Sequence, residues 1–264
     1  MQASYASVQR AWASKFLSSY AMAPLATRTA GVFATRFSVQ NLAVQNRSGS
    51  AAVVGWGGRL PADSTLWKAG QWTNATTTFI DDTADAQSSA ATDVPLTTTT
   101  NNDGFIVMAQ VPFNILSIIV SATVATGAPV YDVAYSIAGG TWTTLTLANL
   151  LVAPAYAAAG ESLLWFESPG DWAMSEAGHA TGIPTGYYAI RVRATTAPTI
   201  APIATQIIPG IIVDSMKAVA DSGVASWNYA SGERDLLAVC DALAVAISGA
   251  SDQNHVTAAY RLHG

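Results

Sequence analysis

A succession of short segments, each rich in β-branched or aromatic residues and bounded by Gly, Pro, Asn or Asp, constrains the fold most strongly. No helical pattern interrupts the series, so it predicts a mainly β protein: an antiparallel β-sandwich of jelly-roll type over residues 63–213. Ala138–Gly140 predicts a hairpin turn within it. The predicted strands are Thr76–Ile80, Phe105–Val111, Ile115–Val124, Val130–Ile137, Thr141–Leu147, Ser162–Glu167, Tyr187–Thr195 and Gln206–Val213.

One of these segments, Tyr187–Thr195, alternates between apolar and basic residues. Tyr188 and Ile190 occupy one set of positions, and Arg191 and Arg193 occupy the other. Because successive side chains of a strand point to opposite faces, the alternation predicts a half-buried strand with a cationic outer face.

The first 62 residues carry positive charge only. They contain six basic residues and no Asp or Glu, a charge of +6, whereas the rest of the chain carries −11, which gives the net −5. Four apolar residues recur at helical spacing: Tyr5, Val8, Trp12 and Phe16. This spacing predicts a short helix bounded by Pro24 and Gly31, and residues 45–58 are rich in loop-forming Gly, Asn and Ser. We therefore expect residues 1–62 to form a basic N-terminal arm without a compact core.

The C-terminal segment, residues 214–264, changes character. An apolar stripe at helical spacing predicts one helix over Glu233–Ser248, followed by Gly249 as its C-terminal cap. The stripe consists of Leu236, Val239, Leu243 and Ile247. Cys240 lies in the same apolar context, which favours a buried, inert thiol. A single cysteine excludes an intramolecular disulfide and fits a reducing cytoplasm.

Composition excludes several classes of protein. Only 11% of the residues are charged, against roughly 25% in an average soluble domain, so the polar surface consists mainly of Thr, Ser, Asn and Gln. Such a surface suits burial against neighbours in an assembly. The net charge of −5 argues against direct nucleic-acid binding. No apolar run reaches the roughly 18–20 residues of a membrane-spanning helix, so we expect no membrane partner.

Motifs that carry chemistry are sparse. The sequence has no phosphate-binding loop and no Gly-x-Ser-x-Gly nucleophile elbow, and its three histidines lack zinc-helix spacing. Asp81, Asp82 and Asp85 resemble part of a cation loop, but the pattern lacks the Gly and distal Glu of an EF-hand, so turn and capping roles are favoured. We therefore predict no catalytic residue, no cofactor, no metal site and no enzymatic activity.

Eight tryptophans require an explanation. Exposed rings on a sandwich would suit stacking on sugars, but large amphipathic rings also fill cores and subunit contacts, and we favour the second interpretation. The tryptophans are Trp12, Trp56, Trp67, Trp72, Trp142, Trp165, Trp172 and Trp227.

Several runs between residues 65 and 205 form a recognisable series of turns and strands. The runs are Lys68–Trp72, Thr78–Gln87, Asn102–Phe105, Tyr135–Ile137, Gly140–Leu145, Trp165–Trp172 and Gly186–Arg193. Together they resemble structural proteins of tailed bacteriophages. The resemblance implies a virion β-sandwich without catalytic content, and it leaves head, neck and tail positions open. Modest size, the absence of coiled-coil or β-helical repeats, and the basic arm favour a head decoration or cement protein.

On this interpretation, the arm docks on an acidic lattice of major capsid protein, and burial of surface across capsomer joints stabilises the shell. We expect a homo-oligomer, a trimer or dimer, on the capsid surface of the virion, after assembly in the host cytoplasm. The predicted capsid-binding residues are Arg10, Trp12, Lys15, Phe16, Arg28, Arg36 and Arg47.

Two alternatives from other functional classes remain. The first is a glycan-binding adsorption module of a head or tail fibre, which would need exposed tryptophans. The second is a virion-associated cell-wall hydrolase that uses a pair of carboxylates for acid–base chemistry. The candidates for such a pair are Glu161, Glu167, Asp171 and Glu176.

Overall fold

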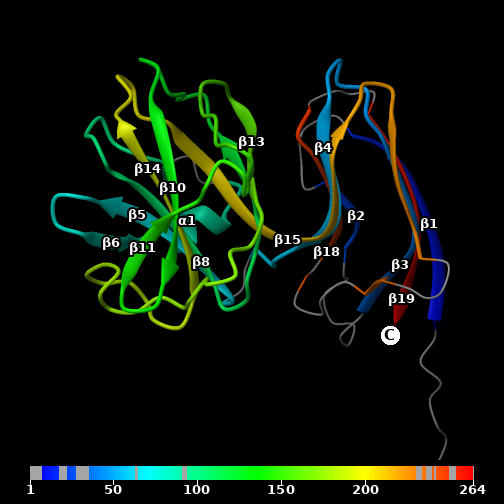
Figure 1. Ribbon diagram of the computed structural model, residues 1–264, viewed down its shortest axis with the longest axis horizontal. Coiled ribbons are helices and arrows are strands. Elements are labelled where there is room, and N and C mark those ends of the chain that lie inside the picture. Colours follow the sequence, from blue (N-terminus) through cyan, green and yellow to red (C-terminus); the bar gives the residue numbers. More distant parts are fainter. Residues whose placement is uncertain are drawn as a thin grey trace, which may run out of the picture. The chain divides into compact units, whose positions relative to one another are not determined.

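The computed structural model describes residues 8–17, 23–27, 36–62, 65–90, 94–229, 234–235, 240, 242–249 and 254–263. Within these ranges the chain is mainly β, and it forms two compact units (Figure 1). Unit 1 consists of Met1–Pro61 and Gly210–Gly264, and unit 2 consists of Ala62–Pro209. No helix in the described ranges is long and apolar enough to cross a membrane.

Unit 2 contains a six-stranded sheet in the order β11–β10–β14–β8–β5–β6, with antiparallel neighbours throughout. Its strands are β5 (Trp67–Thr73), β6 (Thr78–Asp81), β8 (Gly104–Ala109), β10 (Val130–Ile137), β11 (Thr141–Thr144) and β14 (Tyr188–Thr196). The short helix α1 (Thr83–Gln87) follows β6.

The second sheet of unit 2 runs in the order β12–β13–β9–β15, and β7 also pairs with β15. Its strands are β7 (Val94–Pro95), β9 (Ile115–Val120), β12 (Leu150–Val152), β13 (Gly160–Phe166) and the first part of β15 (Ile203–Val219). The mainly β class is thereby confirmed, and the antiparallel sheets are consistent with a β-sandwich. The predicted hairpin is also confirmed: β10 pairs with β11, and Gly139 and Gly140 adopt φ values of 84° and 71°, a region that favours glycine.

Both faces of the six-stranded sheet are covered, because all six residues of β8 are buried. On one face the Phe105 ring meets the edge of Tyr156, at 6.4 Å between ring centroids. On the other, Ile106 and Met108 pack against residues from the segment 172–187. We call this segment the strap, and the face it covers the strap face.

The strap is attached at two sides of the sheet. At β10, the Ala173 amide donates to the Ser136 carbonyl at 3.0 Å. At β6, the Phe79 amide donates to the Thr181 carbonyl at 2.9 Å. Ala180 and Ile183, on either side of Thr181, pack into an apolar cluster with sheet residues that include Phe79.

Unit 1 is built from both ends of the chain. One sheet has the order β1–β19–β3–β16, with β17 also pairing with β3, and the other has the order β15–β4–β18–β2. The strands are β1 (Val8–Leu17), β2 (Ala23–Thr27), β3 (Arg36–Gln45), β4 (Ala52–Arg59), β16 (Val224–Asn228), β17 (Arg234–Asp235), β18 (Ala242–Ile247), β19 (Asn254–His263) and β15 from Gly210 onward.

Both predicted helices are wrong where the structure describes them. Of the N-terminal stripe, Val8, Trp12 and Phe16 lie in β1, which pairs with β19 from Val8 with His263 to Leu17 with Asn254, and Tyr5 lies outside the described residues. In the predicted C-terminal helix, Arg234–Asp235 and Ala242–Ile247 are strands, and all six residues of β18 are buried. Because β18 is apolar on both faces, it satisfies a helical stripe by chance, and strand pairing decides the outcome. Cys240 is buried, as predicted.

The N-terminal segment also differs from the expected arm. β3 pairs with β16 and β19, and β4 pairs with β15 and β18, so the segment 1–61 shares a compact unit with 210–264. Unit 2 is inserted between β4 and β15, where Arg59 and Gly210 are register partners. The sequence hides this arrangement because the strands that pair are about 150 or more residues apart.

Candidate functional site

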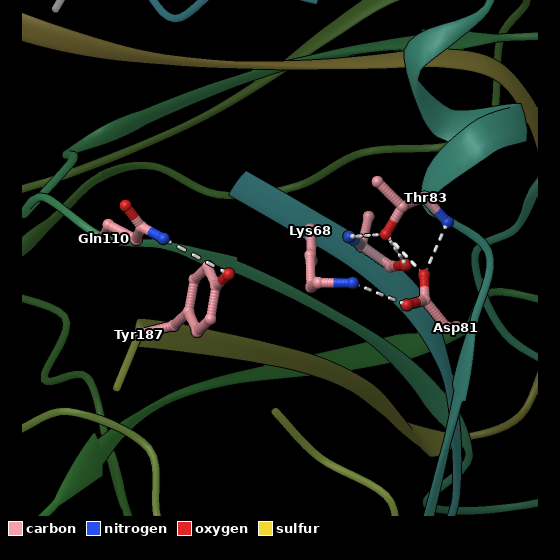
Figure 2. A network of polar contacts seen from close by, with 6 residues as sticks. Lys68, Asp81, Thr83, Gln110 and Tyr187 are labelled. Carbon is pink, nitrogen blue, oxygen red and sulfur yellow. Dashed lines mark hydrogen bonds and ion pairs between the residues drawn. The ribbon is translucent and has the colours of Figure 1, made fainter. Parts of the chain in front are cut away.

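Polar side chains form a row across one end of the strap face. Lys68 of β5 and Asp81 of β6 form an ion pair, with 2.9 Å between Nζ and Oδ2 (Figure 2). Gln110 follows β8, and Tyr187 is the residue before β14. The Gln110 side-chain amide donates to the Tyr187 hydroxyl at 3.4 Å. The Lys68 and Asp81 side chains are 31% and 47% exposed. We call Lys68, Asp81, Thr83, Gln110 and Tyr187 the polar row.

Asp81 is the best-connected member of the polar row. Its Oδ1 accepts from the Thr83 amide at 3.0 Å and from the Thr83 hydroxyl at 2.5 Å, while Oδ2 binds Lys68. Burial raises the pKa of Asp81, but these hydrogen bonds and the Lys68 charge outweigh it, so the pKa lies below the ordinary value. The acidic turn thus uses Asp81 for local turn structure, as predicted. The described residues contain no group of three or more His, Cys, Asp or Glu that could hold a metal ion.

The lowered pKa of Asp81 predicts a small, pH-dependent contribution to stability. We expect Asp81→Asn to lower the free energy of unfolding at pH 7 by less than about 1 kcal/mol, because the pair is partly exposed. The contribution is fully present above the unfolded-state pKa, near 3.8, and is lost as pH falls through the lower folded-state pKa. Urea unfolding at pH 7 and at pH 2.5 measures the difference between the two proteins. A difference that persists undiminished at pH 2.5 would contradict this assignment.

Arg191 of β14 lies farther along the strap face, in contact with two tryptophans. Its Cζ is 4.9 Å from the ring centroid of Trp72 and 4.8 Å from that of Trp142. Arg191 is 8% exposed, and its Nε is fully buried without a hydrogen-bond partner. Burial, and secondarily the charge of Arg193, lowers the pKa of Arg191 to about 10, against an opposing effect of Asp132. The guanidinium therefore remains charged at neutral pH.

His179 of the strap completes this group. Its ring meets Trp142 edge to face at 5.0 Å between centroids, and the Trp142 indole N–H donates to the His179 carbonyl at 3.1 Å. His179 Nδ1 lies 3.0 Å from the Glu176 amide nitrogen and 3.2 Å from the Glu176 carbonyl oxygen. The Nε2 of His179 is buried and has no partner among the described residues. We call Trp72, Trp142, His179 and Arg191 the Arg191 cluster.

The Arg191 cluster corrects the predicted cationic outer face of β14. Arg191 is buried against Trp72 and Trp142, and Arg193 pairs with Asp132 at 3.0 Å with only 29% of its side chain exposed. Sequence reasoning missed the cluster because its members come from β5, β11, the strap and β14. The available signal was an arginine in an apolar strand of a tryptophan-rich chain, which does not reveal which rings it meets.

The predicted capsid-binding residues lie in unit 1 where they are described. Arg10, Trp12, Lys15 and Phe16 belong to β1, and Arg36 begins β3. Arg47 follows β3 and is exposed, and its amide donates to the Asn254 side chain at 2.7 Å. Arg28 lies outside the described residues.

The four candidate catalytic carboxylates have separate contacts. Glu161 accepts a short hydrogen bond from the Ser117 hydroxyl, and Asp171 accepts one from the Tyr135 hydroxyl at 2.9 Å. Glu176 accepts from the Gly139 amide at 3.4 Å. Glu167 is exposed just after β13.

The predicted role of the tryptophans in the core is confirmed for six of the seven whose side chains are described. Trp142 is half-buried, and the buried ones are Trp56, Trp67, Trp72, Trp165, Trp172 and Trp227. Trp12 lies in β1, outside the residues whose side chains are described.

Comparison with known proteins adds no relative to this description. No protein-family model and no curated protein matches the chain.

Proposed function

We propose that the protein is a structural component of a tailed-phage virion: a head decoration or cement protein that binds the major capsid protein and stabilises the shell without catalysis. The observation that carries the proposal is the strand order of unit 2. One sheet contains the order β7–β15–β9–β13, and the other contains β8–β14–β10–β11. These are the neighbours that eight strands of a jelly roll require, a fold common in viral capsid and lectin domains. We therefore propose the jelly-roll type for unit 2.

The insertion of unit 2 supports separate roles for the two units. The chain leaves unit 1 after Arg59 and returns to it at Gly210, and these two residues are register partners on neighbouring strands. A unit inserted in this way can remain free of the capsid while the other unit binds it. The segment that resembles phage structural proteins, residues 65–205, falls within unit 2. We assign attachment to unit 1, whose N-terminal segment carries the positive charge.

Attachment through basic residues should depend on salt. We expect Arg36→Ala with Arg47→Ala to slow association with empty capsid shells about 3- to 10-fold at 50 mM NaCl, since each exposed pair contributes about 0–1 kcal/mol and charge mainly steers encounter. Added salt should slow association of the unaltered protein in the same direction. Association rates can be measured by light scattering on the full chain, and the single substitutions Arg47→Ala in unit 1 and Lys68→Ala in unit 2 form a pair matched in charge.

Two results would refute the attachment model. One is failure of the unaltered protein to bind shells, and the other is binding that neither salt nor the double substitution changes. A cryo-EM map of the particle would locate the chain and test the proposed homo-oligomer, a trimer or dimer on the capsid surface.

Glycan binding is the second candidate function. It is favoured by two half-buried aromatic rings on the strap face, Trp142 and Tyr187, and by the other members of the polar row, of which Gln110 contacts Tyr187. Aromatic rings stack on sugars, while planar polar groups such as the Gln110 amide bind hydroxyls. A jelly-roll fold is also used by lectins.

A further inference from the structure

We propose that the Arg191 cluster binds a carboxylate group through the guanidinium N–H groups of Arg191. This site is independent of the proposed capsid attachment, which we assign to unit 1. It lies on the strap face of unit 2, where β5, β11 and β14 supply the two tryptophans and the arginine.

The first argument is the absence of an acceptor for a buried cation. Within the described part of the chain, the guanidinium of Arg191 makes ring contacts but no hydrogen bond and no ion pair, and its Nε is fully buried. The neighbouring carboxylate, Asp132, is bound instead by Arg193 at 3.0 Å. Buried charged groups in proteins are normally paired and hydrogen-bonded, because an unmet donor is costly. The Arg191 guanidinium therefore lacks a hydrogen-bond acceptor, and a bound anion would supply one.

The second argument is the direction from which an acceptor can approach. Trp72 and Trp142 contact the guanidinium from neighbouring directions, because their ring centroids are only 6.4 Å apart and lie 4.9 and 4.8 Å from Arg191 Cζ. An acceptor must therefore reach the N–H groups of Arg191 from the sides that these two rings do not occupy. A carboxylate carries the opposite charge and accepts two parallel N–H bonds from arginine, so it matches the charge and the fork of donors.

The third argument is a second buried polar atom without a partner, next to the Trp142 ring. His179 Nε2 is buried without a partner, and the His179 ring contacts Trp142. Trp142 itself is only half-buried, so the cluster lies one indole ring below the surface. A carboxylate could come from a simple organic acid or from an acidic sugar, and both sources share the chemistry that Arg191 recognises.

NMR of the indole N–H groups in the full chain tests the site directly. Titrations with sodium acetate, glucuronate, glucose and phosphate at constant ionic strength should shift the Trp72 and Trp142 signals saturably for the two carboxylates only. Glucuronate differs from glucose by its carboxylate, so the pair isolates that group. Binding of acetate and glucuronate alike indicates any carboxylate, whereas binding of glucuronate alone indicates an acidic sugar. Trp142→Phe assigns one of the two signals.

Variants separate the guanidinium from general charge. Arg191→Met should weaken carboxylate binding about 10-fold or more, the effect of losing charge-assisted hydrogen bonds, and Arg191→Lys should weaken it nearly as much because the planar fork is lost. Arg47→Met in unit 1 removes the same charge and should leave binding unchanged. Dispersed amide signals establish that each variant is folded. The proposal is overturned by unshifted indole signals, by equal binding of glucose or phosphate, or by unchanged affinity in folded Arg191→Met.

Discussion

Gly104→Ala is expected to lower the free energy of unfolding of unit 2 by about 3 kcal/mol, the upper range for forcing extra volume into a packed site. An added Cβ at Gly104 would lie 1.9 Å from the Val192 carbonyl oxygen and 2.6 Å from the Arg193 Cα. Both atoms belong to the backbone of β14, which cannot rotate away as a flexible side chain can. β8 and β14 are hydrogen-bonded neighbours, with Gly104 opposite Arg193, so relief requires the sheet to open there.

Urea unfolding of the full chain measures this effect, with Gly170→Ala as the control. Nothing lies within 4 Å of a Cβ added at Gly170, so that substitution should change the free energy of unfolding by less than about 0.5 kcal/mol. Because β14 carries Arg191, Gly104→Ala should also alter the Trp72 indole signal. Equal stabilities of the two variants would show that the backbone of β8 at Gly104 does not approach β14 this closely.

Deleting residues 60–209 and joining Arg59 to Gly210 through Asn-Gly should leave unit 1 folded. Arg59 and Gly210 are register partners on antiparallel strands, so a two-residue turn closes β4 onto β15 as a hairpin. Insertions at such positions are tolerated because the ends of the inserted unit lie close together. By the same argument, residues 62–209 should fold alone. Each piece should show dispersed amide signals and one cooperative unfolding transition.

Deleting residues 1–62 gives the opposite expectation and serves as the contrast. It removes β1 to β4, so β16, β18 and β19 lose the strands with which they pair. Unit 1 should then unfold while unit 2 remains folded, and the buried Trp227 should become solvent-exposed by fluorescence. A truncated chain that keeps Trp227 buried would show that residues 1–62 are a detachable arm after all. If the variant that lacks residues 60–209 fails to fold, unit 1 depends on unit 2 for its stability.

Local sequence signals predicted unit 2 well. The boundaries of β10 agree with the predicted segment Val130–Ile137, and the hairpin that follows agrees as well. Alternating apolar residues and paired glycines are sufficient here because the hairpin partners are neighbours in the chain. The acidic turn at Asp81 was likewise readable, since its hydrogen bonds reach only to Thr83 and to the strand beside it.

The candidate sites were readable only in part. The sequence shows that Arg191 alternates with apolar residues, but not that Trp72 and Trp142 cover it, because these residues are 119 and 49 positions away along the chain. The basic residues near the N-terminus were visible as a charge excess. Their strands were not, because β1 has the apolar spacing of a helix and becomes a strand by pairing with β19.

The sequence by itself determined the mainly β class, the turns of unit 2 and the positive charge of the N-terminal segment. These depend on residue type and near neighbours: β-branched and aromatic residues favour extended backbone, and glycine permits the left-handed turn. Only the tertiary structure decided that the two ends of the chain form one unit, and that Arg191 contacts two tryptophan rings without an ion-pair partner among the described residues. A strand acquires its stability from the partner whose backbone groups it meets across the sheet. For β1 and β4 the partners lie about 150 to 250 residues away, beyond the reach of any local pattern.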